Sequence, residues 1–136
     1  MPKATLTEAD YTVLADFRFT LRQFQAFSES RAAEVGLTPQ QHQALLTLRA
    51  AGDHQATVGY VAARLILKPH SASGLIDRLE AQGLVSRQVA PDDRRQARLC
   101  LTDKAQALLA QLSLTHREEI RRLRPMLVDL LDRLGD

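Results

Sequence analysis

Apolar residues recur at helical spacing along most of the chain, and the first such stretch runs from about residue 7 to residue 34. Thr7 is a suitable N-cap for a helix that begins there. Four apolar residues of this stretch follow one another at intervals of three or four: Leu14, Phe17, Leu21 and Phe24. This spacing places them on one face, so the pattern predicts a long first helix with a continuous apolar seam.

Capping residues mark the starts of two shorter helices. Thr38, Pro39 and Gln41 combine an N-cap, a first-turn proline and the glutamine of a capping box. Thr57 precedes residues 58–65, whose apolar residues repeat at i, i+3, i+4 and i+7. We therefore expect one helix to begin after Thr38 and another after Thr57.

A fourth helix is expected from Pro69 to the residues before Gly83, with one apolar stripe along it. Gly36, Gly52 and Gly83 each follow a helical stretch. Glycine adopts the left-handed conformation that ends many helices at little cost. We expect that conformation at all three glycines.

The periodicity changes to that of strands after Gly83. Residues 85–89 and 96–101 read as two extended segments on either side of a polar tip, and this arrangement predicts a β-hairpin. A last helix is then expected from Thr102 to the end of the chain. Its apolar seam consists of Ile120, Leu123, Leu127, Leu130 and Leu134. Pro125 interrupts this seam and predicts a kink or a new helix start.

Composition narrows the class of protein. The 136 residues suit a single domain, and 45% hydrophobic with 25% charged residues is ordinary for a soluble globular protein. No apolar run is long enough to span a bilayer, and the first residues do not lead into a signal-peptide core. The lone Cys100 cannot form an internal disulfide. We expect a cytoplasmic protein with no membrane association.

The small net charge of +2 is distributed unevenly. Residues 57–98 carry seven basic and four acidic side chains, whereas residues 1–56 carry five and six, and residues 99–136 carry six and six. An excess of positive charge in the middle third favours a polyanionic partner. An ordinary solvated surface is the alternative on charge alone.

Two short helices followed by a hairpin, with the positive charge upon them, are the parts of a winged helix-turn-helix. The helix expected at residues 69–82 leaves small polar residues opposite its apolar stripe, which suits entry into a DNA major groove. Two arginines at the hairpin tip suit a narrow minor groove. The candidate DNA-contacting residues are Lys68, Pro69, His70, Ser71, Ser73, Gly74, Arg78, Arg94 and Arg95.

Several runs of residues resemble the motifs of one family of regulators. In the helices they are Thr57-Val58-Gly59, Ala62-Ala63-Arg64-Leu65, Leu75-Ile76-Asp77-Arg78-Leu79-Glu80 and Gly83-Leu84-Val85. In the hairpin, Asp93-Arg94-Arg95 followed by Leu101-Thr102 is similar to the family's Asp-x-Arg…Leu-Thr signature. Over nearly its whole length the chain resembles the MarR (multiple antibiotic resistance regulator) family.

This resemblance implies a mainly α fold with a small β-hairpin. Dimerisation helices at 7–36 and 103–136 would flank a winged helix-turn-helix lobe at 38–102. The implied dimer interface, which the apolar seams also favour, includes Leu14, Leu21, Ile120, Leu123, Leu127 and Leu130. The implied function is that of a homodimeric repressor, bound to double-stranded DNA at a pseudo-palindromic operator and released by a small-molecule effector.

The resemblance also assigns roles to individual residues. Ser71 and Ser73 would read the major groove, and Arg95 would enter the minor groove with Arg94 as a second contact. Asp93 would orient arginine in the wing. Gly74 departs from the family, because a longer polar side chain is common at its position, and this departure leaves the base preference open.

The effector site and its alternatives rest on other residues. An anionic aromatic effector would suit the aromatic and basic groups Phe17, Arg18, Phe24, Phe27 and His42, although packing between helices also accounts for these aromatics. The four histidines, His42, His54, His70 and His116, lack a metal-ligand spacing, so we expect neither metal nor cofactor. We find no catalytic motif and expect no enzyme. A metal- or redox-responsive regulator, the latter through Cys100, and a winged-helix protein–protein module stay open as alternatives.

Overall fold

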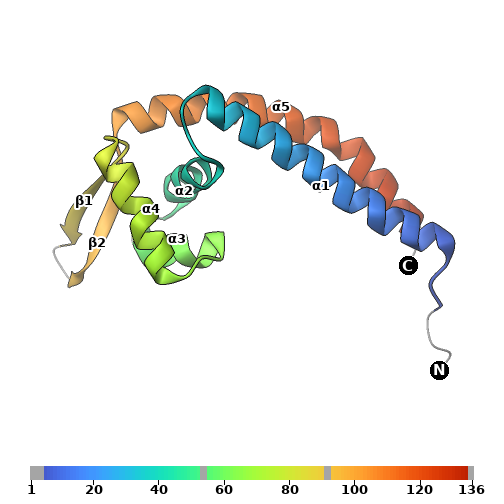
Figure 1. The fold of residues 1–136 in the computed structure, drawn as a ribbon, viewed down its shortest axis with the longest axis horizontal. Helices are drawn as coiled ribbons and strands as arrows, with labels where there is room; N and C mark the ends of the chain where they lie inside the picture. The colour runs from blue at the N-terminus through green and yellow to red at the C-terminus, as the bar shows by residue number, and fades with distance from the viewer. Residues whose placement is uncertain (1–4, 53–54, 91–92, 135–136) are drawn as a thin grey trace. The chain divides into compact units, whose positions relative to one another are not determined.

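The computed structural model describes residues 5–52, 55–90 and 93–134, with the backbone alone for Ala90 and residues 93–96. The elements, in chain order, are α1 (Glu8–Glu34), α2 (Pro39–Ala50), α3 (Val58–Leu65), α4 (Pro69–Ala81), β1 (Val85–Ala90), β2 (Asp93–Leu101) and α5 (Asp103–Leu134) (Figure 1). The predicted fold class, mainly α with one small antiparallel hairpin, is confirmed.

The chain divides into two compact units. Residues 32–112 form one unit, which contains α2, α3, α4 and the hairpin, and we call it the winged-helix lobe. The described residues before 32 and after 112, from α1 and α5, form the other unit, which we call the helical arm. Within the described ranges, no helix combines the length and the apolar character needed to cross a membrane.

Threonine caps begin the helices as the sequence predicts. Thr38 Oγ1 accepts a hydrogen bond from the Gln41 N–H at 3.1 Å, and Gln41 Oε1 accepts one from the Thr38 N–H at 3.0 Å. This capping box satisfies two backbone donors that the start of a helix leaves unpaired. Thr7 and Thr57 each accept a hydrogen bond from the backbone N–H three residues later, at 3.2 and 3.1 Å.

The helix ends agree with the sequence at two glycines out of three. Gly36 and Gly83 adopt positive φ angles of 79° and 72°. The prediction for Gly52 is wrong, because α2 passes into an extended backbone and the Gly52 N–H donates to the side chain of Gln55 at 3.2 Å. A left-handed residue occurs instead after α3, at Ile66, where φ is 54°.

The core of the winged-helix lobe is built from the apolar stripes of its helices and the base of the hairpin. Its most buried large residues are Leu45, Val61, Leu75, Ile76, Leu79, Leu84, Val85 and Leu99. Burying one such side chain stabilises a fold by about 1.5–3 kcal/mol. The stripe predicted for α4 is therefore confirmed as the face that holds this helix to the lobe.

The hairpin is anchored to the lobe at its base. Val85 pairs with Leu101, and the register continues to Val89 opposite Ala97. The Leu99 N–H donates to the carbonyl of Ala56 at 2.7 Å, which ties β2 to the segment that precedes α3. The tip of the hairpin therefore projects from a fixed base.

The helical arm is an antiparallel pair formed by α1 and α5 (Figure 1). The His116 Nε2 lies 2.8 Å from the Ser28 Oγ, and an Arg133 amine lies 3.4 Å from an Asp16 carboxylate oxygen. Because α5 is continuous from residue 103 to residue 134, the predicted alternative of a new helix start at Pro125 is wrong. Pro125 is exposed, so water can bond the carbonyl that loses its helical partner.

Candidate nucleic-acid interface

The start of α4 differs from the starts of the other helices. α1, α2, α3 and α5 each begin after a threonine whose hydroxyl accepts a backbone hydrogen bond. α4 begins after Lys68, whose side chain makes no such bond. The N–H groups of the first turn are therefore available to an outside acceptor, and phosphate is a favourable one at a helix N-terminus.

The first turns of α4 present a small polar surface. Lys68, Pro69, His70, Ser71 and Ser73 are exposed. The opposite face of α4 is buried in the core, so rotation of the helix about its axis is fixed by packing. The structure thus brings together, on one face, the α4 residues that the sequence predicted.

A groove of about 360 Å³ runs along this face. It is lined by Gln40, Leu67, His70, Ser71, Gly74 and Arg78. Gly74 keeps the groove open, yet a Cβ added there would lie 3.7 Å from the Arg78 Nη1, an ordinary contact. Gln40 and Leu67 are not among the predicted site residues, because they come from the end of another helix and from a turn. Only the tertiary fold places them beside α4.

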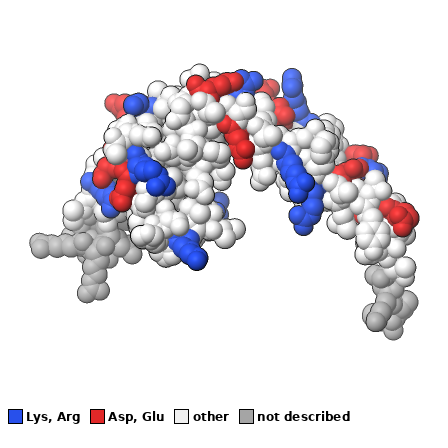
Figure 2. Space-filling model, viewed as in Figure 1, with Lys and Arg blue, Asp and Glu red and all other residues white. Residues whose placement is uncertain are grey.

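An ion-pair cluster joins α4 to the wing. The Arg87 Nη2 on β1 lies 2.5 Å from the Asp77 Oδ1, and the Arg87 Nε lies 3.6 Å from the Glu80 Oε2. Figure 2 shows basic and acidic side chains side by side where α4 meets β1. Sequence reasoning missed Arg87, because its partners lie on another element and helical spacing does not reveal them.

The tip of the hairpin carries the predicted wing residues. Asp93 begins β2, and Arg94 and Arg95 follow it in the same strand. Their side chains lie outside the described part of the structure, as does all of His54. Minor-groove contact by Arg94 and Arg95, and an orienting role for Asp93, stay predictions.

The predicted effector residues do not form one cluster. Phe24 and Phe27 lie edge-on to the His116 ring, with centroids 6.1 and 5.6 Å away. Phe17 and Arg18 are exposed on the helical arm, and neither belongs to these ring contacts. His42 is buried and belongs to the winged-helix lobe. The part played by these residues in effector binding stays a prediction.

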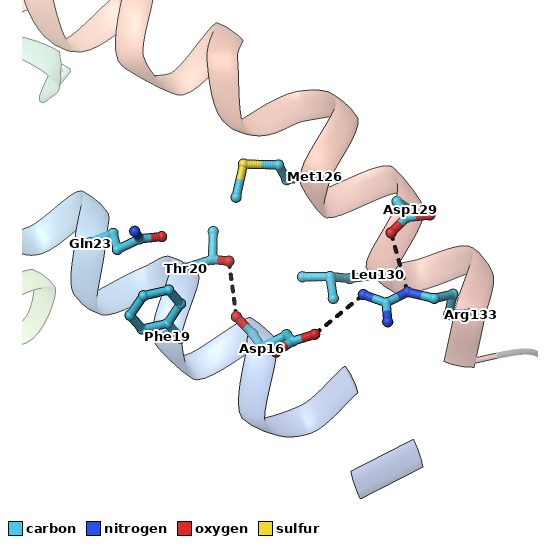
Figure 3. Close-up of a pocket in the computed structure, with 8 residues that line it drawn as sticks. All are labelled: Asp16, Phe19, Thr20, Gln23, Met126, Asp129, Leu130 and Arg133. Atoms are coloured by element: carbon cyan, nitrogen blue, oxygen red, sulfur yellow. Dashed lines mark hydrogen bonds and ion pairs between the residues drawn. The ribbon is translucent and has the colours of Figure 1, made fainter. Parts of the chain in front are cut away.

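The helical arm has a pocket of its own, of about 200 Å³. Figure 3 shows its lining, which consists of Asp16, Phe19, Thr20, Gln23, Met126, Asp129, Leu130 and Arg133. The guanidinium of Arg133 bridges the carboxylates of Asp16 and Asp129, at 3.4 and 3.2 Å. The residues predicted to hold an effector are not part of this lining.

The predicted dimer residues differ in how much surface they offer. Leu14 is 47% exposed, Leu21 43% and Ile120 54%, whereas Leu123 and Leu127 are half-buried. Leu130 is only 5% exposed within a single chain. Its side chain therefore leaves little surface for a partner, while Leu14, Leu21 and Ile120 leave much more.

Metal and redox chemistry gain no support from geometry. Among the residues that the structure describes, no three histidine, cysteine or acidic side chains gather as metal ligands. Cys100 is half-buried on β2, opposite Ser86 on β1. A sensing role for Cys100 stays an untested alternative.

Comparison with known proteins agrees with the geometry. Residues 35–96 match the model of the MarR family. YsmB of Bacillus subtilis (strain 168), an uncharacterized HTH-type transcriptional regulator, is 29% identical over 113 residues, which are 80% of this chain and 75% of YsmB.

Solved structures share the fold over most of the chain. AbsC, a MarR family transcriptional regulator from Streptomyces coelicolor, has a TM-score of 0.73 and 21% identity over 88% of this chain and 81% of its own. The S. aureus MepR–DNA complex has a TM-score of 0.70 and 20% identity, over 88% and 91%. With the sequence match over the α2–β2 region, these similarities identify the chain as a member of the MarR family of transcription regulators.

Proposed function

We propose that this protein regulates transcription, without catalytic activity, by binding double-stranded DNA as a homodimer through α4 and the hairpin. The observation that carries the proposal is the start of α4. An uncapped N-terminus is joined there to a continuous polar face, while the opposite face is locked into the core. A rigid helix with free N–H groups at its start can bond phosphate and present Ser71 and Ser73 to base edges.

The charges around α4 support this docking. Lys68 at the helix start and Arg78 on the groove are both exposed and can contact the backbone of the duplex. The Asp77 carboxylate lies on the same helix, but Arg87 neutralises it. The fold is also that of MepR, which has been solved in complex with DNA. Phosphate contacts would supply affinity, and the serines would supply sequence preference.

The exposed apolar surface of the helical arm supports a homodimer. Its large exposed residues include Leu14, Phe17, Phe19, Leu21, Ile120, Met126, Val128 and Leu131. Contiguous apolar patches of this kind are uncommon on monomers and mark sites of association. A symmetric pair of arms would present two lobes, which fits two half-sites of a pseudo-palindromic operator.

Regulation would follow from the coupling between the arms and the lobes. We propose that the bound protein represses transcription and that a small molecule, with an anionic aromatic compound as the leading candidate, releases it. Phe17 and Arg18 are exposed and suit such a ligand. The ligand can release DNA only if it binds the free arrangement of the dimer more tightly than the DNA-bound one. We expect this to occur in the cytoplasm.

Binding across a salt series tests this proposal. The purified protein is titrated into a labelled duplex enriched from a random-sequence library and, separately, into an unselected duplex. We expect tighter binding to the enriched duplex, and affinity that falls linearly with salt on a logarithmic plot. A winged-helix protein–protein module would show neither the preference nor the salt dependence.

A further inference from the structure

Three helices of the chain end in the same hydrogen-bond motif. The N–H of the second residue past the helix donates to a carbonyl five residues earlier, at 2.9 Å in each case: Leu37 to Ala32, Leu67 to Ala62 and Leu84 to Leu79. The motif requires a left-handed conformation at the residue before each donor. That residue is Gly36 after α1, Ile66 after α3 and Gly83 after α4.

Isoleucine is an unfavourable choice for this position. The backbone of Ile66 has φ 54° and ψ 51°, where the Cβ of an L-residue crowds its own backbone. A β-branched residue there is a true outlier, whereas Gly36 and Gly83 adopt the same conformation freely. Strain of this kind persists where the surrounding structure holds it, and it gathers at functional sites.

Packing within the chain does not explain the isoleucine. Its side chain is 91% exposed. The next residue, Leu67, packs against the core of the lobe and makes the 2.9 Å hydrogen bond of the motif. The fold therefore needs the turn and needs Leu67, but it gains nothing from the apolar side chain at position 66.

The location of Ile66 indicates what its side chain contacts. Ile66 lies two residues before Lys68, and Leu67 between them lines the groove along α4. The exposed side chain is thus continuous with the surface that we propose to enter the major groove. A recognition helix contacts base edges with its N-terminal residues, which brings the preceding turn to the groove wall.

We propose that Ile66 is a DNA-contacting residue that packs on the apolar surface of the duplex, either the methyl group of a thymine or a deoxyribose. This proposal rests on the function proposed above. The contact covers a side chain that is exposed in the free protein, so it contributes to affinity through the hydrophobic effect. It also accounts for isoleucine at a position where the fold alone favours glycine.

The first test compares stability with DNA binding in one variant. Ile66→Gly removes the strain and should raise Tm by about 2–4 °C. It should weaken binding to a duplex enriched by the wild-type protein by about fivefold to tenfold. Ile66→Leu keeps an apolar side chain and should bind within about twofold of the wild type. Unchanged affinity in Ile66→Gly, or equal losses in both variants, would overturn the proposal.

A matched control measures the strain by itself. A Cβ added at Gly36 meets no atom within 4 Å, so Gly36→Ile adds left-handed strain without a clash. We expect this variant to lower Tm by about the amount that Ile66→Gly raises it. Its affinity for the same duplex should not change. A higher Tm in Gly36→Ile would contradict the strain on which the proposal depends.

Uracil substitution separates the two DNA surfaces. If Ile66 contacts a thymine methyl, replacing that thymine with deoxyuridine weakens the wild type and leaves Ile66→Gly unaffected. If it contacts a deoxyribose, no uracil substitution reproduces the loss seen in Ile66→Gly. Failure of the wild type to bind any duplex would contradict the proposed function itself. Wild-type binding with no loss in Ile66→Gly would overturn this inference alone.

Discussion

The guanidinium of Arg87 on β1 contacts the carboxylate of Asp77 on α4 at 2.5 Å. The pair connects the proposed recognition helix to the strand that leads into the wing. It also neutralises an acidic side chain on a helix that we expect to lie against phosphates. Both side chains are partly exposed, at 35% for Arg87 and 67% for Asp77, so the pair adds little to folding stability.

Removal of Arg87 should therefore impair DNA binding more than folding. Arg87→Gln leaves Asp77 charged near the phosphates, and we expect a loss of roughly fivefold in affinity, about 1 kcal/mol. Tm should change by only a few degrees at most. Fluorescence anisotropy and thermal unfolding measure the two effects.

A second substitution decides how Arg87 acts. In the Arg87→Gln background, Asp77→Asn removes the repelling carboxylate and should restore most of the lost affinity. If the double variant binds as weakly as Arg87→Gln, Arg87 contacts phosphate directly and its role is not to neutralise Asp77.

The wing arginine has a distinct signature in salt. If Arg95 enters the minor groove, Arg95→Ala should weaken binding and reduce the slope of log affinity against log salt by about one. Tm should stay near that of the wild type, because a hairpin tip adds little to the core. Arg122→Ala, which removes an arginine that is 82% exposed on the helical arm, is the matched control and should leave the slope unchanged. An unaltered slope in Arg95→Ala would exclude the minor-groove role.

Ser73 tests whether α4 reads sequence. Its side chain is exposed opposite the buried stripe of α4. Ser73→Ala should cost ~1–3 kcal/mol in binding to the enriched duplex, with a much smaller effect on a random duplex. Competition titrations with both duplexes measure the difference. Equal losses on the two duplexes would make Ser73 a phosphate contact instead.

The dimer prediction is best tested at an exposed position of the helical arm. Leu21 is 43% exposed in a single chain, so Leu21→Glu can be accommodated by a folded monomer. In a dimer seam the new carboxylate would be buried without a partner, at a cost of several kcal/mol. Sedimentation should show a monomer, and tight binding to the enriched duplex should be lost. A dimer of normal affinity would place the interface away from Leu21.

Features encoded by neighbouring residues were predicted best. The capping box at Thr38 and Gln41 and the proline at the start of α4 depend on residues within one helical turn, and both are confirmed. The buried stripe of α4 follows from helical periodicity alone. The fold class and the polar face of α4 could therefore be predicted from the sequence.

Features that depend on tertiary structure could not be predicted. The ion pair between Arg87 and Asp77 joins two elements, and the lining of the groove by Gln40 depends on how α2 lies against α4. Ile66 was missed for a different reason, because glycine is the usual signal for a left-handed residue. The same preference led to the wrong prediction at Gly52.

Selection of DNA by the purified wild-type protein tests the central claim most directly. The protein is incubated with a random-sequence duplex library, and the bound duplexes are sequenced after several rounds. We predict an enriched inverted repeat whose half-sites are separated by about one helical turn, roughly 10 base pairs from centre to centre. No enrichment would contradict sequence-specific binding, and a single half-site without its repeat would contradict binding by a symmetric dimer.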